Sequence, residues 1–211
     1  EMVFAACGAC NSSSRTTDAV ASMVARMERD LEVGTPKYEE WLKLANGVAR
    51  NAPDFIREMT STSKTVWAPD PSGRLVTYEL CEAEGPTFER HMRIFALKCG
   101  MAIYRRHIDA PLPEGGMVYA RYFLNEGIPA EVIAKVLRIL PAMGTLRQGT
   151  FNVEDQFVYR YNANTDERIV AAAISFHSGL HVVTFALADE KLAPLIDELT
   201  FFRCSPGELF S

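Results

Sequence analysis

The feature that most constrains the fold is a long segment, from about residue 86 to residue 107, that is apolar on two opposite faces of a helix. One face holds Phe88, Met92, Phe95, Cys99, Ala102 and Ile103, and the other holds Ile94, Leu97, Met101 and Tyr104. A helix that is apolar on two sides is normally packed between two layers. At 1.5 Å per residue it is about 33 Å long, which is enough to cross a domain. The pattern therefore predicts a central helix that the rest of the chain surrounds.

Helical patterns also occupy the chain before this central helix. Apolar residues repeat at helical spacing after Thr16-Thr17-Asp18, whose side chains are typical of a helix N-cap. A second helix is expected from Thr35-Pro36, with a hydroxyl at the cap and a proline at the first helical position. Shorter helices are expected after Asn51-Ala52-Pro53, near residues 129–139 and over residues 192–199.

Strand patterns dominate after the central helix. Residues 117–124 are strand-like, and residues 157–161 alternate between a packed face and a mixed face. Ile169 to Ala188 is twenty residues without a formal charge, nominally long enough to cross a bilayer. The β-branched residues around Ser178-Gly179 instead favour a hairpin of two buried strands. The order of the elements predicts an α+β fold in which an antiparallel sheet packs around the central helix.

The composition, 48% hydrophobic and 23% charged, is that of an ordinary globular domain and excludes a disordered chain. With 22 Lys and Arg against 27 Asp and Glu, the net charge is −5, so any contact with nucleic acid must come from a local patch. The five cysteines do not have the spacing of a disulfide framework. With no export signal visible, we expect a cytoplasmic protein without a membrane partner; the sequence assigns no other partner and no oligomeric state.

The sharpest local motif is Cys7-Gly8-Ala9-Cys10-Asn11. Two thiolates separated by two residues can converge on one tetrahedral zinc ion, because the turn directs both sulfur atoms inward. Zinc requires four ligands, however, and no second Cys-x-x-Cys or His-x-x-His spacing occurs in the sequence. The motif is therefore either half of a zinc site or a turn that carries two incidental thiols. A thioredoxin-like redox role is disfavoured because the motif does not belong to a βαβ unit.

Small apolar residues that lead into Cys-x-x-Cys-Asn, followed by a serine-rich loop and an amphipathic helix, resemble the second half of the zinc-binding HNH-endonuclease motif. Four later segments are similar to uncharacterised bacterial proteins in which an HNH-like finger leads into an α+β domain: residues 50–53, 95–100, 146–149 and 155–157. The resemblance implies that residues 1–30 are the second half of this motif with its helix and that residues 31–211 are the α+β domain. It also implies that Cys7 and Cys10 are structural zinc ligands, with Asn11 as a weaker ligand where the family often has a histidine.

The resemblance implies less about catalysis. In the family, the histidine that activates water lies upstream of this turn, where this chain, which begins at Glu1 without an initiator Met, has no residues. Hydrolysis of a phosphodiester requires both a metal ion and a base. We therefore expect a chain that is entered partway through its sequence, and we assign no catalytic residue.

A second candidate site lies on the polar side of the central helix. His91, Lys98 and Arg105 recur at seven-residue spacing, with Arg90, Arg93 and Arg106-His107 nearby. Such a row could bind an anion such as a phosphate. The alternative, which we favour, is a core helix whose long basic side chains extend to solvent, those in the last turn stabilising the negative end of the helix dipole.

A third candidate is an acid–base or metal site in the β-rich part of the chain. It would combine Glu154-Asp155 with His177 and His181. Adjacent residues on a strand point to opposite faces, so the two carboxylates are not expected to converge. The two histidines flank the expected hairpin turn, where polar residues are common. Cys99 lies in the apolar stripe without an evident base, which argues against a thiol nucleophile.

Two functional hypotheses follow. The first is the C-terminal part of a bacterial HNH-like zinc-binding protein, with a metal-dependent nuclease as a dependent option. The second is a metal-free α+β interaction or binding domain whose thiols are incidental, because its core is built for packing and shows no convergent polar cluster.

Overall fold

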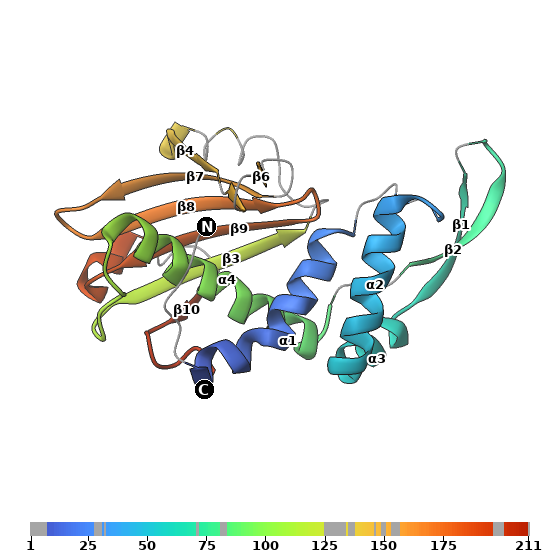
Figure 1. Ribbon diagram of the computed structural model, residues 1–211, viewed down its shortest axis with the longest axis horizontal. Helices are drawn as coiled ribbons and strands as arrows, with labels where there is room; N and C mark the ends of the chain where they lie inside the picture. Colours follow the sequence, from blue (N-terminus) through green and yellow to red (C-terminus); the bar gives the residue numbers. More distant parts are fainter. Residues whose placement is uncertain are drawn as a thin grey trace.

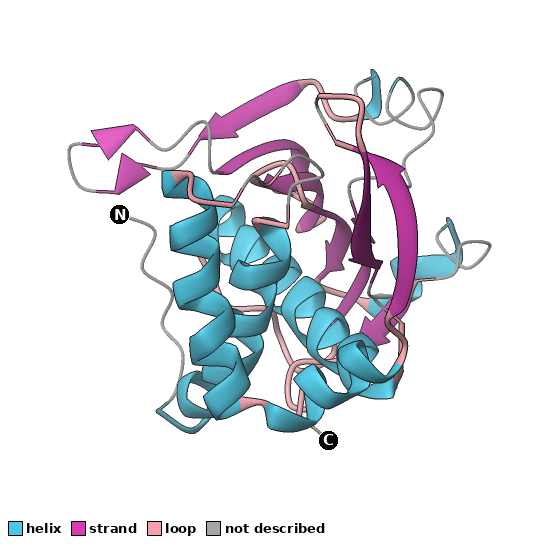
Figure 2. Ribbon diagram, turned by 90° about the vertical axis from the view of Figure 1, so that its right-hand side faces the viewer, coloured by secondary structure: helices cyan, strands magenta, loops and turns pink. Residues whose placement is uncertain are grey.

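The predicted central helix is present as α4, Pro86–Ile108, and it organises the fold. In the computed structural model, α4 lies across one face of a six-stranded antiparallel sheet and contacts α1, Gly8–Ala25, on another side (Figure 1). This arrangement confirms the predicted α+β architecture with an antiparallel sheet around a long helix. The long helices gather on one side of the curved sheet (Figure 2).

The structure describes residues 8–27, 31, 33–70, 72–80, 84–124, 134, 138–145, 147–148, 151–152, 157–195 and 201–210. The remaining helices are α2 (Pro36–Asn51), α3 (Pro53–Ser61) and the 3₁₀ helix η1 (Glu190–Leu195). The strands are β1 (Lys64–Pro69), β2 (Leu75–Leu80), β3 (Met117–Leu124), β4 (Ala142–Thr145), β5 (Arg147–Gln148), β6 (Phe151–Asn152), β7 (Phe157–Asn164), β8 (Ile169–Phe176), β9 (Leu180–Leu187) and β10 (Phe202–Cys204). The expected helix at 129–139 lies largely outside the described residues, and of the one at 192–199 the described part belongs to η1.

The large sheet has the strand order β10-β3-β9-β8-β7-β4, and every neighbouring pair is antiparallel. The uncharged stretch forms β8 and β9, which turn at residues 177–179 and pair Phe176 with Leu180. The prediction of a hairpin is therefore confirmed. Among the described residues, no helix combines the length and the apolar character that crossing a bilayer requires. A separate hairpin of β1 and β2 extends away from the large sheet beyond α2 and α3 (Figure 1).

Close packing at Gly100 brings α4 against the sheet. A Cβ atom at this position would overlap the side chains of Thr184 and Val118. The Thr184 hydroxyl in turn donates a hydrogen bond to the Tyr119 carbonyl oxygen at 3.0 Å. The main apolar core lies here, where Leu97 and Tyr104 of α4 are among the fully buried side chains.

A second apolar cluster fixes α1 and α3 against α4. Phe55 of α3 stacks on Phe88 of α4 with ring centroids 6.0 Å apart, and both side chains are buried. The end of α1 also meets the β8–β9 turn, because the Gly179 amide donates to the Ala25 carbonyl oxygen at 3.1 Å. These contacts explain why α4 is apolar on more than one face.

The two predicted helix starts have different outcomes. The Thr35 hydroxyl caps α2 by accepting from the Tyr38 amide at 3.3 Å, as its sequence predicts. Helix α1 instead begins at Gly8, so the predicted cap Thr16-Thr17-Asp18 lies inside the helix. These polar side chains are suited to a cap, but Thr17 and Asp18 are used for contacts with α4 instead.

Candidate anion-binding groove

Lys98, the middle residue of the predicted basic row on α4, has internal partners on α1. Its Nζ atom donates to Asp18 Oδ2 at 2.5 Å and to Ser14 Oγ at 2.8 Å. The Ser14 side chain is fully buried and also donates to Asp18 at 3.2 Å. The charge of Lys98 is therefore largely compensated inside the interface between α1 and α4.

His91 lies seven residues before Lys98 on α4, and it faces the same interface with α1. Its Nδ1 atom lies 3.1 Å from the hydroxyl of Thr17, which is buried. Burial and the nearby Arg90 charge lower the pKa of His91, whereas the Glu58 carboxylate raises it less strongly. Glu58 itself accepts hydrogen bonds from the Thr87 amide at 2.9 Å and the Phe88 amide at 2.7 Å. It thereby caps α4, whose first N–H groups otherwise have no acceptor within the helix.

Arg105, the last residue of the row, serves the other end of α4. Its guanidinium donates to the Asp109 carbonyl oxygen at 2.7 Å, just beyond the final turn. A cation at this position also stabilises the negative end of the helix dipole. The contacts of His91, Lys98 and Arg105 thus support the structural interpretation of the row, and its binding of an anion stays a prediction.

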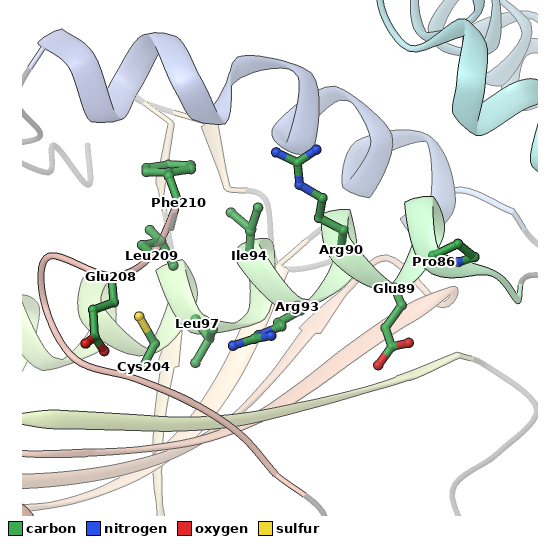
Figure 3. Close-up of a pocket in the computed structure, with 10 residues that line it drawn as sticks. All are labelled: Pro86, Glu89, Arg90, Arg93, Ile94, Leu97, Cys204, Glu208, Leu209 and Phe210. Atoms are coloured by element: carbon green, nitrogen blue, oxygen red, sulfur yellow. The ribbon is translucent and has the colours of Figure 1, made fainter.

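A groove lies elsewhere on α4, between this helix and the C-terminal segment (Figure 3). Its volume is about 540 Å³. Of its described lining residues, six come from α4 (Pro86, Glu89, Arg90, Arg93, Ile94 and Leu97), one is Cys204 at the end of β10, and three follow β10 (Glu208, Leu209 and Phe210).

Two arginines give the groove its chemistry. Arg90 and Arg93 are both exposed, and within the described part of the chain neither donates a hydrogen bond or forms an ion pair. Each guanidinium carries several N–H donors in a planar fork that matches a carboxylate or a phosphate. Across the described ranges these donors have no protein acceptor, in contrast to the ammonium group of Lys98.

The two glutamates that line the groove, Glu208 and Glu89, lie in different surroundings. Glu208 accepts from both the hydroxyl of Ser205, at 2.5 Å, and the Ser205 amide, at 3.4 Å. These hydrogen bonds lower the pKa of Glu208, so it is ionised at neutral pH. Glu89 is exposed and lies near Pro86 at the opposite end of the groove from Leu209 and Phe210 (Figure 3).

Apolar side chains form the other part of the lining. Ile94 and Leu97 are 8% and 1% exposed, and Leu209 and Phe210 are partly buried beside them (Figure 3). The Cys204 thiol is buried and donates to the Ser205 carbonyl oxygen at 2.9 Å. Burial raises its pKa, as it does for Cys99 of α4, so both thiols are protonated and poorly nucleophilic at neutral pH.

The zinc half-site lies at the boundary of the described chain. Cys10 and Asn11 belong to the first turns of α1, and Cys7 lies outside the described residues. Over the described ranges, no three His, Cys, Asp or Glu residues gather into a group that could hold a metal ion. The zinc site stays a prediction from the sequence.

The third predicted site is only partly visible, because Glu154 and Asp155 lie outside the described residues. His181 Nδ1 lies 2.9 Å from the hydroxyl of Ser175, its partner across the β8–β9 pair. Burial lowers the pKa of His181. His177 lies in the turn with a φ of 49°.

The sequence identified Arg90 and Arg93 only as neighbours of the basic row. What it missed is the C-terminal segment, which lies more than a hundred residues later in the chain and closes the groove. The apolar pair Leu209-Phe210 at the end of a polar tail was the one signal available. No protein-family model, curated protein or solved structure matches this chain, so the functional argument depends on the geometry of the groove.

Proposed function

We propose that this chain is a binding domain that holds a small anionic ligand in the groove between α4 and the C-terminal segment. The observation that carries the proposal is the pair Arg90 and Arg93, which have no acceptor among the described residues and border a concave, partly apolar site. A groove of about 540 Å³ falls in the usual size range of small-molecule sites.

Arginine chemistry supports an anion as the recognised group. Hydrogen bonds from a guanidinium to a carboxylate or phosphate are shorter and stronger than those between neutral groups. Residues 90 and 93 lie on adjacent turns of one helix. Their guanidinium groups point in different directions and both border the groove, so each offers donors to a ligand at a different point of the lining (Figure 3). Binding is favoured over catalysis because the Cys204 thiol is held neutral and Glu208 is engaged by Ser205.

Titration with butyl phosphate tests this proposal, with affinity measured by calorimetry or by NMR chemical shifts. The double variant Arg90→Gln and Arg93→Gln should weaken binding at least tenfold, because it removes both cationic donors. The matched control, Lys43→Gln with Lys191→Gln, removes two exposed positive charges away from the groove and should change affinity less than twofold. Equal binding by the groove variant and the wild type would exclude the proposal.

A zinc-binding role, with nuclease chemistry as a dependent option, is the second candidate and is supported by the spacing of Cys7 and Cys10. Elemental analysis of the protein in its longest natural form tests it. A stoichiometric zinc content that falls in Cys7→Ser and Cys10→Ser is expected. A zinc content below about a tenth of an equivalent, unchanged in Cys7→Ser, would exclude this role.

A further inference from the structure

We propose that the ligand of the groove is a single-chain amphiphile, an alkyl chain that ends in one anionic oxyacid head such as a phosphate or a carboxylate. This inference rests on the proposed function, because it assigns the head to Arg90 and Arg93. It adds that the apolar part of the groove binds the chain.

The two chemistries of the groove follow each other along α4. Arg90 and Arg93 precede Ile94 and Leu97, and four residues of helix, as from Arg93 to Leu97, span about 6 Å. Leu209 and Phe210 extend the apolar lining at this same end of the groove (Figure 3). In Figure 3 Arg90, Ile94, Leu209 and Phe210 follow each other along one side of the groove, and the carboxylate of Glu208 points away from Phe210. A linear ligand on this side therefore meets a cationic donor first and apolar side chains after it.

The carboxylates limit the charge of the head. Glu89 and Glu208 line the groove together with the two arginines, so the formal charges of its described lining residues are balanced. Glu208 is held ionised by Ser205. A polyanion such as a nucleic acid would carry many charges past both carboxylates and be repelled by them, whereas a ligand with one compact anionic head meets less repulsion.

The apolar lining is suited to one chain in a concave site. Leu97 belongs to the main core and is 1% exposed, so the floor of the groove is continuous with rigid, packed structure. Leu209 packs partly against this same core, which fixes the wall that the C-terminal segment provides. A concave site of this size suits a monomeric amphiphile dispersed in water rather than the surface of a bilayer.

The test measures the affinity of butyl, hexyl and octyl phosphate, each below its micellar concentration, together with octanol. Each methylene that enters the groove should raise affinity about two- to fourfold, as expected from the burial of apolar surface. Octanol should bind at least tenfold more weakly than octyl phosphate, because it lacks the anionic head.

Phe210→Ser separates the two parts of the groove. It should weaken the binding of octyl phosphate at least fivefold and that of butyl phosphate less than twofold. The control Trp67→Ser removes a large side chain that is 70% exposed on the β1–β2 hairpin, and it should change neither affinity.

The outcomes distinguish this inference from the proposed function. If butyl and octyl phosphate bind equally and both depend on Arg90 and Arg93, the amphiphile is excluded while the anion site stands. If octanol binds as well as octyl phosphate, or if no alkyl phosphate binds, both are excluded. Binding to phosphatidylglycerol vesicles without binding to monomeric octyl phosphate would also overturn the inference.

Discussion

The basic residues of α4 differ in their hydrogen bonding between the interface with α1 and the groove beside the C-terminal segment. On the side of α4 that faces α1, Lys98 donates to Asp18 and Ser14, and His91 lies beside the buried hydroxyl of Thr17. On the side that borders the C-terminal segment, Arg90 and Arg93 are exposed and have no acceptor among the described residues. A basic residue on a helix therefore becomes a candidate ligand-binding group only where the tertiary structure leaves its donors unused.

Regular spacing along α4 did not indicate which of its basic residues border the groove. His91, Lys98 and Arg105 share a seven-residue period, which placed them in one predicted row. The structure uses them to join α1 to α4 and to close the C-terminal end of α4. The two arginines of the groove stand outside that period, and their setting depends on a distant segment.

The largest expected effect is on stability and comes from the packing of α4 against the sheet. This packing positions both the residues of α4 that face α1 and those that line the groove. Gly100→Ala should lower the free energy of unfolding by about 1–3 kcal/mol, because its Cβ atom would overlap Thr184 and Val118. Gly47→Ala in α2 is the matched control, since nothing lies within 4 Å of its added Cβ atom. It should raise stability by about 0.5–1 kcal/mol through helix propensity. Urea unfolding of the two variants measures both effects, and equal effects would contradict the close packing at Gly100.

A smaller expected effect compares the stability contributions of Lys98, which contacts α1, and Arg93, which lines the groove. Lys98→Met should lower the free energy of unfolding by about 1 kcal/mol, a value reduced by the partial exposure of Lys98 and Asp18. Arg93→Met should change it by less than about 0.5 kcal/mol, because its donors have no internal acceptor among the described residues. Chemical denaturation gives both values. A larger cost for Arg93→Met than for Lys98→Met would reverse the comparison.

The smallest expected effect is a pH dependence from the α1 side. The pKa of His91 is lowered from 6.5 by burial, so as pH falls the unfolded state gains a proton before the folded state does. Stability should therefore decrease as the pH falls through about 6.5 toward the folded-state pKa. His91→Gln should reduce this slope, and a remainder is expected because burial also lowers the pKa values of His107 and His181. Unfolding free energies at about pH 7.5, 6.5 and 5.5 test this, and an unchanged slope in His91→Gln would contradict it.

Much of the fold could be predicted because its determinants are local. The two apolar faces of α4 and the uncharged hairpin around Ser178-Gly179 are periodic patterns within single segments. The start of α1 could not be predicted in this way, because Thr17 and Asp18 suit a cap in isolation and contact α4 only in the folded chain. Thr17 and Asp18 could serve as a cap or as interior residues of a helix, and their contacts with α4 favour the second arrangement.

The candidate site was much less predictable. Its two arginines are visible in the sequence, but that they have no acceptor among the residues that the structure describes is a property of the folded chain. The wall that Leu209 and Phe210 provide depends on the C-terminal segment crossing α4 after β10 pairs with β3. No local pattern encodes that pairing, because β10 is a short edge strand of three residues.

The most direct test of the central claim observes the charged side chains themselves during ligand binding. NMR signals of the arginine Nε–H and lysine Nζ groups can be followed while octyl phosphate is added. We expect the signals of Arg90 and Arg93 to shift with saturation, while those of Lys98 and Arg105, which already have internal acceptors, stay in place. Shifts centred on Lys98 and Arg105, with Arg90 and Arg93 unmoved, would contradict it.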